Sequence, residues 1–155
     1  MADRLEDFQR FRTDLNEEIL GCGHLGIKRF FALDHQAYEP GPLGTKQKEL
    51  LGLVASAVLR CDDCITYHLI RCAEEGVTDE EFFETFNVIL IVGGSITIPH
   101  LRRAVETLEE IREKAPSDGV KAHPGKRGNG ETGKGKIKFP SRLSRFFTSI
   151  PYRDV

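Results

Sequence analysis

Residues 49–76 read ELLGLVASAVLRCDDCITYHLIRCAEEG. Residues 50–59 within this stretch are apolar on nearly every side, which predicts a helix that is buried all round at the centre of a helical bundle. Three reactive side chains follow it, namely Cys61, Cys64 and His68. On a helix that begins near Cys61, Cys64 lies one turn before His68 and Cys61 lies two turns before it. All three side chains are therefore expected on one side of that helix.

The two cysteines are placed for redox chemistry. Cysteines three residues apart at a helix start can close a disulfide, and the unpaired backbone N–H groups there favour the thiolate, which attacks peroxides and disulfides. Asp62 and Asp63 lie between the cysteines, and their carboxylates disfavour a thiolate. Activation is therefore expected either to be weaker or to rest more on His68 as the adjacent base. Tyr67, one turn from Cys64, is a candidate to support substrate binding through a hydrogen bond, and it fits a packing role equally well.

Glu49 is expected to lie opposite His68. An antiparallel hairpin with its turn near Arg60 brings residues 50–59 against the helix that carries the cysteines. At about 1.5 Å of rise per residue, Cys64 then lies one turn and His68 two turns from the hairpin's end, with Glu49 deeper. This order predicts a route that moves a proton away from the thiol. Taken on its own, Glu49 also fits a solvated glutamate in a first helical turn, which the helix dipole favours.

A longer pattern joins these residues: Glu, eleven residues, Cys-x-x-Cys-x-x-x-His, seven residues, Gly. Its members here are Glu49, Cys61, Cys64, His68 and Gly76. In this pattern the chain resembles the alkyl hydroperoxidase D-like branch of the carboxymuconolactone decarboxylase family. The resemblance runs from about residue 46 to residue 108 and does not cover the last forty residues.

The resemblance implies a thiol-dependent peroxidase or disulfide oxidoreductase that reduces alkyl hydroperoxides. Cys64 is then the cysteine that attacks the peroxide, and Cys61 is the resolving cysteine that closes the disulfide. His68 and Glu49 form the proton relay. No bound cofactor is implied, and the expected reductant is an external dithiol donor protein of the dihydrolipoamide type. The resemblance also implies a homotrimer or homohexamer.

Three competing functions stay open on the sequence alone. The first is a metal-binding module, because Cys61, Cys64 and His68 are candidate zinc ligands. The candidates for a fourth ligand are Cys72, Cys22 and His24. Structural zinc sites usually take their ligands from separated loops, and Cys72 fits a small buried residue better than a redox or metal-binding one. The second is a decarboxylase-type enzyme, although the decarboxylases of that name lack this cysteine pair. The third is a non-enzymatic oligomeric module.

Apolar stripes and stop signals predict further helices along the chain. Together with the two above, they give an all-α bundle of about six helices, at roughly residues 5–19, 27–34, 49–59, 61–75, 79–92 and 99–114. Residues 88–92 fit a buried strand by composition, but their helical surroundings favour a helix. Thr78 and Glu81 predict a capping box before that helix. The aromatic residues expected to point inward on the second helix are Phe30, Phe31 and Tyr38.

Charge separates the body of the chain from its end. The 155 residues carry a net charge of −2, whereas residues 115–155 hold nine Lys and Arg against three Asp and Glu. We therefore expect a helical domain at 1–114, a flexible Gly- and Lys-rich linker at 115–138, and a basic, partly apolar tail at 139–155. This tail fits either an arm that docks on an acidic surface or a disordered end. No apolar run approaches the ~20 residues that span a membrane. The sequence predicts a cytoplasmic protein without membrane or nucleic-acid partners.

Overall fold

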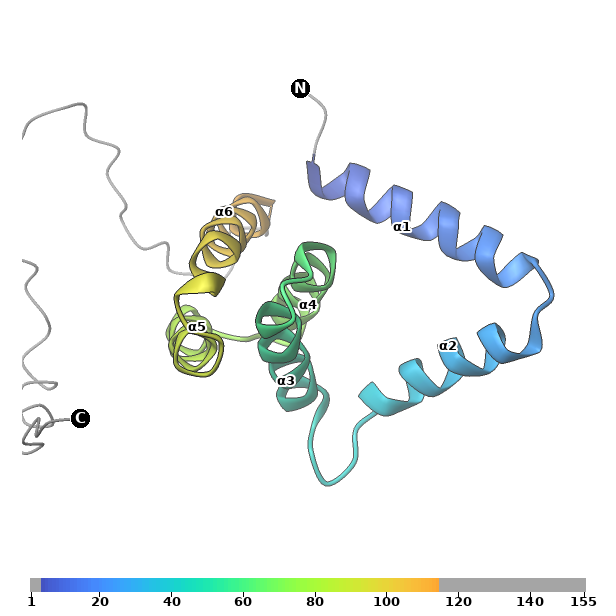
Figure 1. Ribbon diagram of the computed structural model, residues 1–155, viewed down its shortest axis with the longest axis horizontal. Helices are drawn as coiled ribbons and strands as arrows, with labels where there is room; N and C mark the ends of the chain where they lie inside the picture. Colours follow the sequence, from blue (N-terminus) through green and yellow to red (C-terminus); the bar gives the residue numbers. More distant parts are fainter. Residues whose placement is uncertain (1–3, 115–155) are drawn as a thin grey trace, which may run out of the picture. The chain divides into compact units, whose positions relative to one another are not determined.

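The computed structural model describes residues 4–114, and in that part of the chain all regular secondary structure is helical (Figure 1). The helices are α1 (Arg4–Gly21), α2 (Leu25–Tyr38), α3 (Thr45–Val58), α4 (Asp62–Glu74), α5 (Asp79–Gly93) and α6 (Ile98–Lys114), with the 3-10 turn η1 (Ser95–Thr97) before α6. The prediction of an all-α fold with about six helices is confirmed. The predicted linker at 115–138 and tail at 139–155 lie outside the described residues.

The core is built around the hairpin of α3 and α4. Helix α3 packs on α4 and α5, and α4 packs on α6, so these four helices gather together in Figure 1. The buried apolar cluster between them consists of Leu53, Ala57, Ile65, Leu69, Cys72, Val77, Phe82, Phe86, Ile89, Ala104 and Leu108. The stripe predicted for α6 joins it, since Ala104 and Leu108 are buried and Leu101 packs against the cluster. Burial of this apolar surface holds the hairpin that carries the reactive residues.

The ends of the helices follow the predicted signals. Arg60 has φ 62° and closes the α3–α4 hairpin where the turn was expected. Gly76, with φ 71°, follows α4 in the left-handed conformation that glycine adopts without strain. The predicted capping box is present: Thr78 N–H donates to Glu81 Oε2 at 2.8 Å, and Glu81 N–H donates to the Thr78 hydroxyl at 3.3 Å. Residues 88–92 are helical within α5, so the helix predicted for them is confirmed.

Helix α3 is not buried all round, and this prediction was wrong. Leu53 is fully buried, but Leu51 and Leu59 are exposed, Leu59 by 76%. The helical period turns only one side of α3 toward α4 and α5, while its other side faces away from them in a single chain. Helix α3 therefore has more apolar side chains than the core of a single chain covers.

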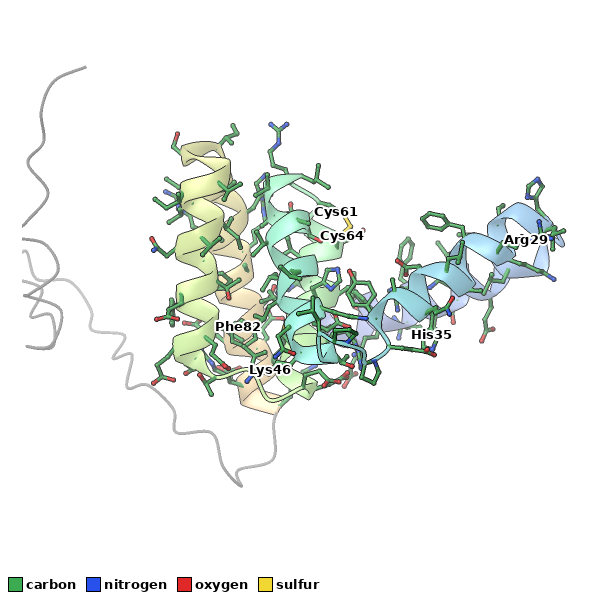
Figure 2. The ribbon with its side chains drawn as sticks, turned by 90° about the horizontal axis from the view of Figure 1, so that it is seen from below. Arg29, His35, Lys46, Cys61, Cys64 and Phe82 are labelled. Atoms are coloured by element: carbon green, nitrogen blue, oxygen red, sulfur yellow. A yellow bond between two sulfur atoms is a disulfide. The ribbon has the colours of Figure 1, made fainter. Side chains whose placement is uncertain are left out.

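Helix α2 is also more exposed than predicted. Phe30 does not point inward, because 69% of it is exposed, whereas Phe31 and Tyr38 are half-buried. Helix α2 packs mainly against α1 and α3, and in Figure 2 its residue Arg29 lies far from the four-helix core. Only the end of α2 that holds Tyr38 reaches the hairpin. None of the helices within residues 4–114 is both long and apolar enough to cross a membrane.

Candidate functional site

A disulfide lies at the beginning of α4. Cys61 and Cys64 are joined with an S–S distance of 2.10 Å and a Cα–Cα distance of 5.3 Å. Cys61 is the N-cap residue of α4 in an extended conformation, and its sulfur accepts the Cys64 backbone N–H at 3.3 Å. Figure 2 shows the bond at one end of the hairpin, opposite the end where Lys46 and Phe82 lie. The three-residue spacing of the cysteines thus predicted a pair that can form a disulfide.

Cys64 is the more exposed of the two cysteines. The residue is exposed, whereas Cys61 is half-buried. Cys64 also lines an open cavity of about 420 Å³. The other residues around this cavity are His68, Tyr67, Asp63, Tyr38, Asp34 and, on α1, Phe8, Phe11, Arg12, Leu15, Asn16 and Ile19. A substrate in this space contacts Cys64 beside a largely apolar wall.

His68 is paired with a buried carboxylate on the facing helix. Its Nδ1 lies 2.8 Å from Glu49 Oε2, and only 7% of His68 and 1% of Glu49 are exposed. The interpretation of Glu49 as a solvated first-turn residue is therefore wrong. An ionised carboxylate can only accept a hydrogen bond, so with Glu49 ionised the ring donates through Nδ1–H. Because Nδ1 carries the hydrogen, Nε2 is the ring nitrogen left to accept a proton. His68 is one helical turn from Cys64, as the spacing predicted.

Glu49 has a second partner that the sequence reasoning missed. Arg71 Nε lies 3.5 Å from Glu49 Oε1, and the same guanidinium contacts Glu74 and Glu75. A buried carboxylate is costly unless positive or hydrogen-bonding groups surround it, and Arg71 supplies such a group from the outer side of α4. The available signal was the position of Arg71, three residues after His68 and therefore on nearly the same face.

Gly52 makes room for the His68 ring. A Cβ placed on Gly52 would lie 2.5 Å from His68 Cε1, 2.7 Å from His68 Nε2 and 2.7 Å from the Tyr38 hydroxyl oxygen. Such distances are shorter than van der Waals contact. Gly52 was missed in the sequence, although a glycine inside an otherwise apolar helix often marks a close approach.

Replacing Gly52 by alanine is expected to lower the free energy of unfolding by about 1–3 kcal/mol, the usual cost of overpacking. A glycine-to-alanine substitution inside a helix otherwise stabilises the protein by about 0.5–1 kcal/mol. The sign of the change in unfolding free energy therefore shows whether the added methyl group clashes. Gly21, the last residue of α1, is the control for the added methyl group itself, because a Cβ there meets nothing within 4 Å. Urea unfolding of the two variants measures the difference. A Gly52→Ala protein as stable as Gly21→Ala would contradict this packing.

The charge of Asp62 is compensated from α6. His100 Nδ1 lies 2.6 Å from Asp62 Oδ1, and Arg103 Nη1 lies 3.1 Å from Asp62 Oδ2. The sequence predicted that the carboxylates beside the cysteines oppose a thiolate. These two cationic or hydrogen-bonding partners offset that effect for Asp62, whereas Asp63 stays exposed at the cavity. Neither His100 nor Arg103 was recognised from the sequence, because both come from a distant helix.

Tyr67 contacts His68 through its ring. The centroids are 5.2 Å apart in an edge-to-face arrangement, and the Arg12 guanidinium lies 4.0 Å above the Tyr67 ring. Both contacts support the packing role that was considered for Tyr67. A second ring also packs on His68, since α2 contributes Tyr38 at a centroid distance of 5.5 Å.

The remaining cysteines do not gather around the disulfide. Cys72 is fully buried in the core cluster, and burial raises the pKa of its thiol to about 12. Cys22 is exposed directly after α1. Within residues 4–114, no three His, Cys, Asp or Glu side chains are grouped so that they could hold a metal ion. The zinc hypothesis therefore lacks a ligand set in the part of the chain that the structure describes.

The chain is similar to known proteins over most of its described residues. The model of the carboxymuconolactone decarboxylase family matches residues 27–107. Two crystal structures of a Thermotoga maritima protein are each 61% identical in sequence to this chain. The match to the first covers 70% of this chain and 95% of the Thermotoga chain, with a TM-score of 0.68. The match to the second covers 69% of this chain and 91% of the Thermotoga chain, with a TM-score of 0.67. The second is described as a member of that family and linked, as a possibility, to the antioxidative response. A family protein from Legionella pneumophila, solved in its apo form, is 27% identical over 72% of this chain and 97% of that chain, with a TM-score of 0.58. No curated protein matches the chain.

Proposed function

The chain belongs to the carboxymuconolactone decarboxylase family, and we propose that it is a thiol-dependent peroxidase that reduces hydroperoxides through Cys61 and Cys64. One observation carries this proposal. The closed cysteine pair lies one helical turn from a histidine that is hydrogen-bonded to a buried glutamate. A structural disulfide needs no such base beside it, whereas a reactive thiol does. The antioxidative link in the name of a Thermotoga maritima relative points the same way.

The proposed cycle begins with both cysteines reduced. Cys64 attacks because it is exposed at the cavity, whereas Cys61 is half-buried as the helix cap. The Cys64 sulfur forms a bond to the terminal oxygen of the hydroperoxide, the O–O bond breaks, and an alcohol and a Cys64 sulfenic acid result. The Cys61 thiolate then attacks the Cys64 sulfur. Water leaves, and the disulfide that the structure contains is formed.

His68 and Glu49 move the proton in this cycle. His68 Nε2 accepts the proton of the Cys64 thiol, because Nδ1 is occupied by its hydrogen bond to Glu49. The imidazolium that forms is stabilised by the carboxylate at 2.8 Å. A positioned acid–base pair of this kind typically contributes about 10²–10⁴-fold to a rate. Arg71 balances the carboxylate when His68 is neutral.

An external dithiol closes the cycle. We propose a carrier of the dihydrolipoamide type, which reduces the disulfide through a mixed disulfide on the exposed Cys64. No bound cofactor takes part. A reducing cytoplasm suits this cycle, since it keeps the pair available as thiols between turnovers.

We infer that several copies of the chain assemble. The large apolar side chains exposed on α3, at its C-cap and on α5 are Leu51, Leu59, Phe83, Val88, Leu90, Ile91 and Val92. Single exposed apolar residues are ordinary, but a gathering of this size on two neighbouring helices favours a covered surface. A homotrimer or homohexamer is the expected form. Light scattering of the full chain measures its mass directly.

The function is tested by coupled turnover. With tert-butyl hydroperoxide and dihydrolipoamide, the protein is expected to oxidise one dithiol per hydroperoxide consumed. The control is the double variant Cys61→Ser, Cys64→Ser, which keeps the fold but lacks both sulfurs. Equal rates for the two proteins would reject the peroxidase. Zinc content and decarboxylation of a γ-lactone acid, measured on the same samples, would then decide between a metal-binding module and a decarboxylase.

A further inference from the structure

Tyr38 brings a hydroxyl group to the reactive face of His68. It is the last residue of α2, and its hydroxyl oxygen lies on the side of α3 that Gly52 leaves open. A Cβ at Gly52 would be 2.7 Å from this oxygen and equally 2.7 Å from His68 Nε2. Both groups therefore share the space that the missing side chain leaves. Tyr38 also lines the cavity that contains Cys64 and His68.

The two groups have complementary roles in hydrogen bonding. With Glu49 ionised, His68 Nδ1 donates to it, and Nε2 of the neutral ring is then an acceptor. The Tyr38 hydroxyl is a donor that keeps its proton, since burial raises its pKa and the nearby Glu49, Asp34 and Tyr67 add to the same effect. A protonated phenol can give its proton to a substrate. It can then take a proton back from a neighbouring histidine that alternates between its neutral and charged forms.

A tyrosine that only packs against its neighbours uses its ring, and its hydroxyl group can then point to solvent. The Tyr38 ring does pack on His68, at a centroid distance of 5.5 Å and an angle of 35°. Its hydroxyl oxygen, however, lies near His68 and Gly52 at the cavity that holds the accessible sulfur. Peroxide cleavage produces a strongly basic oxygen in this same cavity, and that oxygen needs a proton donor.

We propose that Tyr38 is a catalytic acid of the peroxide step, an inference that rests on the proposed function. As the Cys64 thiolate attacks the terminal oxygen, the O–O bond breaks and its electron pair stays on the departing oxygen. The Tyr38 hydroxyl gives that oxygen its proton, so that an alcohol leaves. The phenolate then takes from His68 the proton that His68 removed from the Cys64 thiol. The balance is one thiol and one hydroperoxide converted to one sulfenic acid and one alcohol.

The test compares two oxidants whose leaving groups differ in basicity. tert-Butyl hydroperoxide releases an alkoxide that needs a proton, whereas peracetic acid releases acetate, which is stable without one. Rapid mixing of the reduced full-length protein with each oxidant measures the rate of Cys64 oxidation. Tyr38→Phe is expected to slow the reaction with tert-butyl hydroperoxide by about 10²-fold and to leave that with peracetic acid nearly unchanged.

Tyr67→Phe is the matched control, because Tyr67 also places its ring against His68. It is expected to change both rates by the same factor. If Tyr38→Phe likewise slows both oxidants equally, or slows neither, Tyr38 is not the acid, and the peroxidase itself still stands. If the wild-type protein reacts with neither oxidant at Cys64, the proposed function fails and the role of Tyr38 fails with it.

Discussion

Replacing Cys64 by serine is expected to reduce peroxide consumption to the level of buffer, whereas Cys61→Ser is expected to complete one turnover and stop. Cys64 is the exposed sulfur, one turn from His68 and in contact with the cavity. Without Cys61, nothing resolves the sulfenic acid that forms on Cys64, and it accumulates. Peroxide loss and the mass of the intact protein, taken after one equivalent of oxidant, measure the two results.

The serine variants are a matched pair because they differ by one sulfur at either end of the same bond. Both should keep the stability of the reduced wild-type protein, which urea unfolding checks. A sulfenic acid found on Cys61 in the Cys64→Ser protein would reverse the assignment of the two roles. Equal peroxide consumption by all three proteins would place the chemistry elsewhere in the chain.

The second large effect is expected at the buried pair. His68→Gln and Glu49→Gln should each slow thiol oxidation at pH 7 by about 10²–10⁴-fold, the usual contribution of a positioned acid–base group. The loss should shrink near pH ~10, because a thiol with an ordinary pKa of about 8.5 ionises there unaided. Pre-steady-state rates, measured from below neutral pH to this alkaline limit, give the profile.

Glu74→Gln is the control for this profile. Glu74 is an exposed carboxylate that shares Arg71 with Glu49 but does not contact His68. Its replacement should leave the profile unchanged. An equal fall in the His68→Gln rate at every pH would show that His68 holds the structure of the site and does not move protons.

The sequence predicted the parts of the site that depend on local geometry. Cys61, Cys64 and His68 belong to one helix start, where the spacing alone fixes their relative positions. Glu49 required one further assumption, the hairpin turn near Arg60, and the positive φ of Arg60 closes the chain there. Motifs within one hairpin are therefore readable from the sequence.

The sequence did not predict the contacts set by packing between helices. The closeness of Gly52 to His68 and Tyr38 depends on how near α2 and α4 approach α3, which no spacing along the chain encodes. Similarly, the exposure of Leu59 and Phe30 was missed because apolar composition shows that a side chain favours burial without showing what covers it.

Mass spectrometry of the cysteines tests the central claim most directly. The protein is reduced, treated with one equivalent of hydroperoxide, alkylated and digested. We expect the peptide with Cys61 and Cys64 to lose two hydrogens and resist alkylation, and dihydrolipoamide to restore both thiols. Cys22 should stay alkylatable, and Cys72 should stay a thiol, because it is buried and its pKa is about 12. The contradicting result is that Cys61 and Cys64 can still be alkylated after the peroxide treatment, while the oxidation is found on Cys22. The cysteine pair would then not be the site of peroxide reduction.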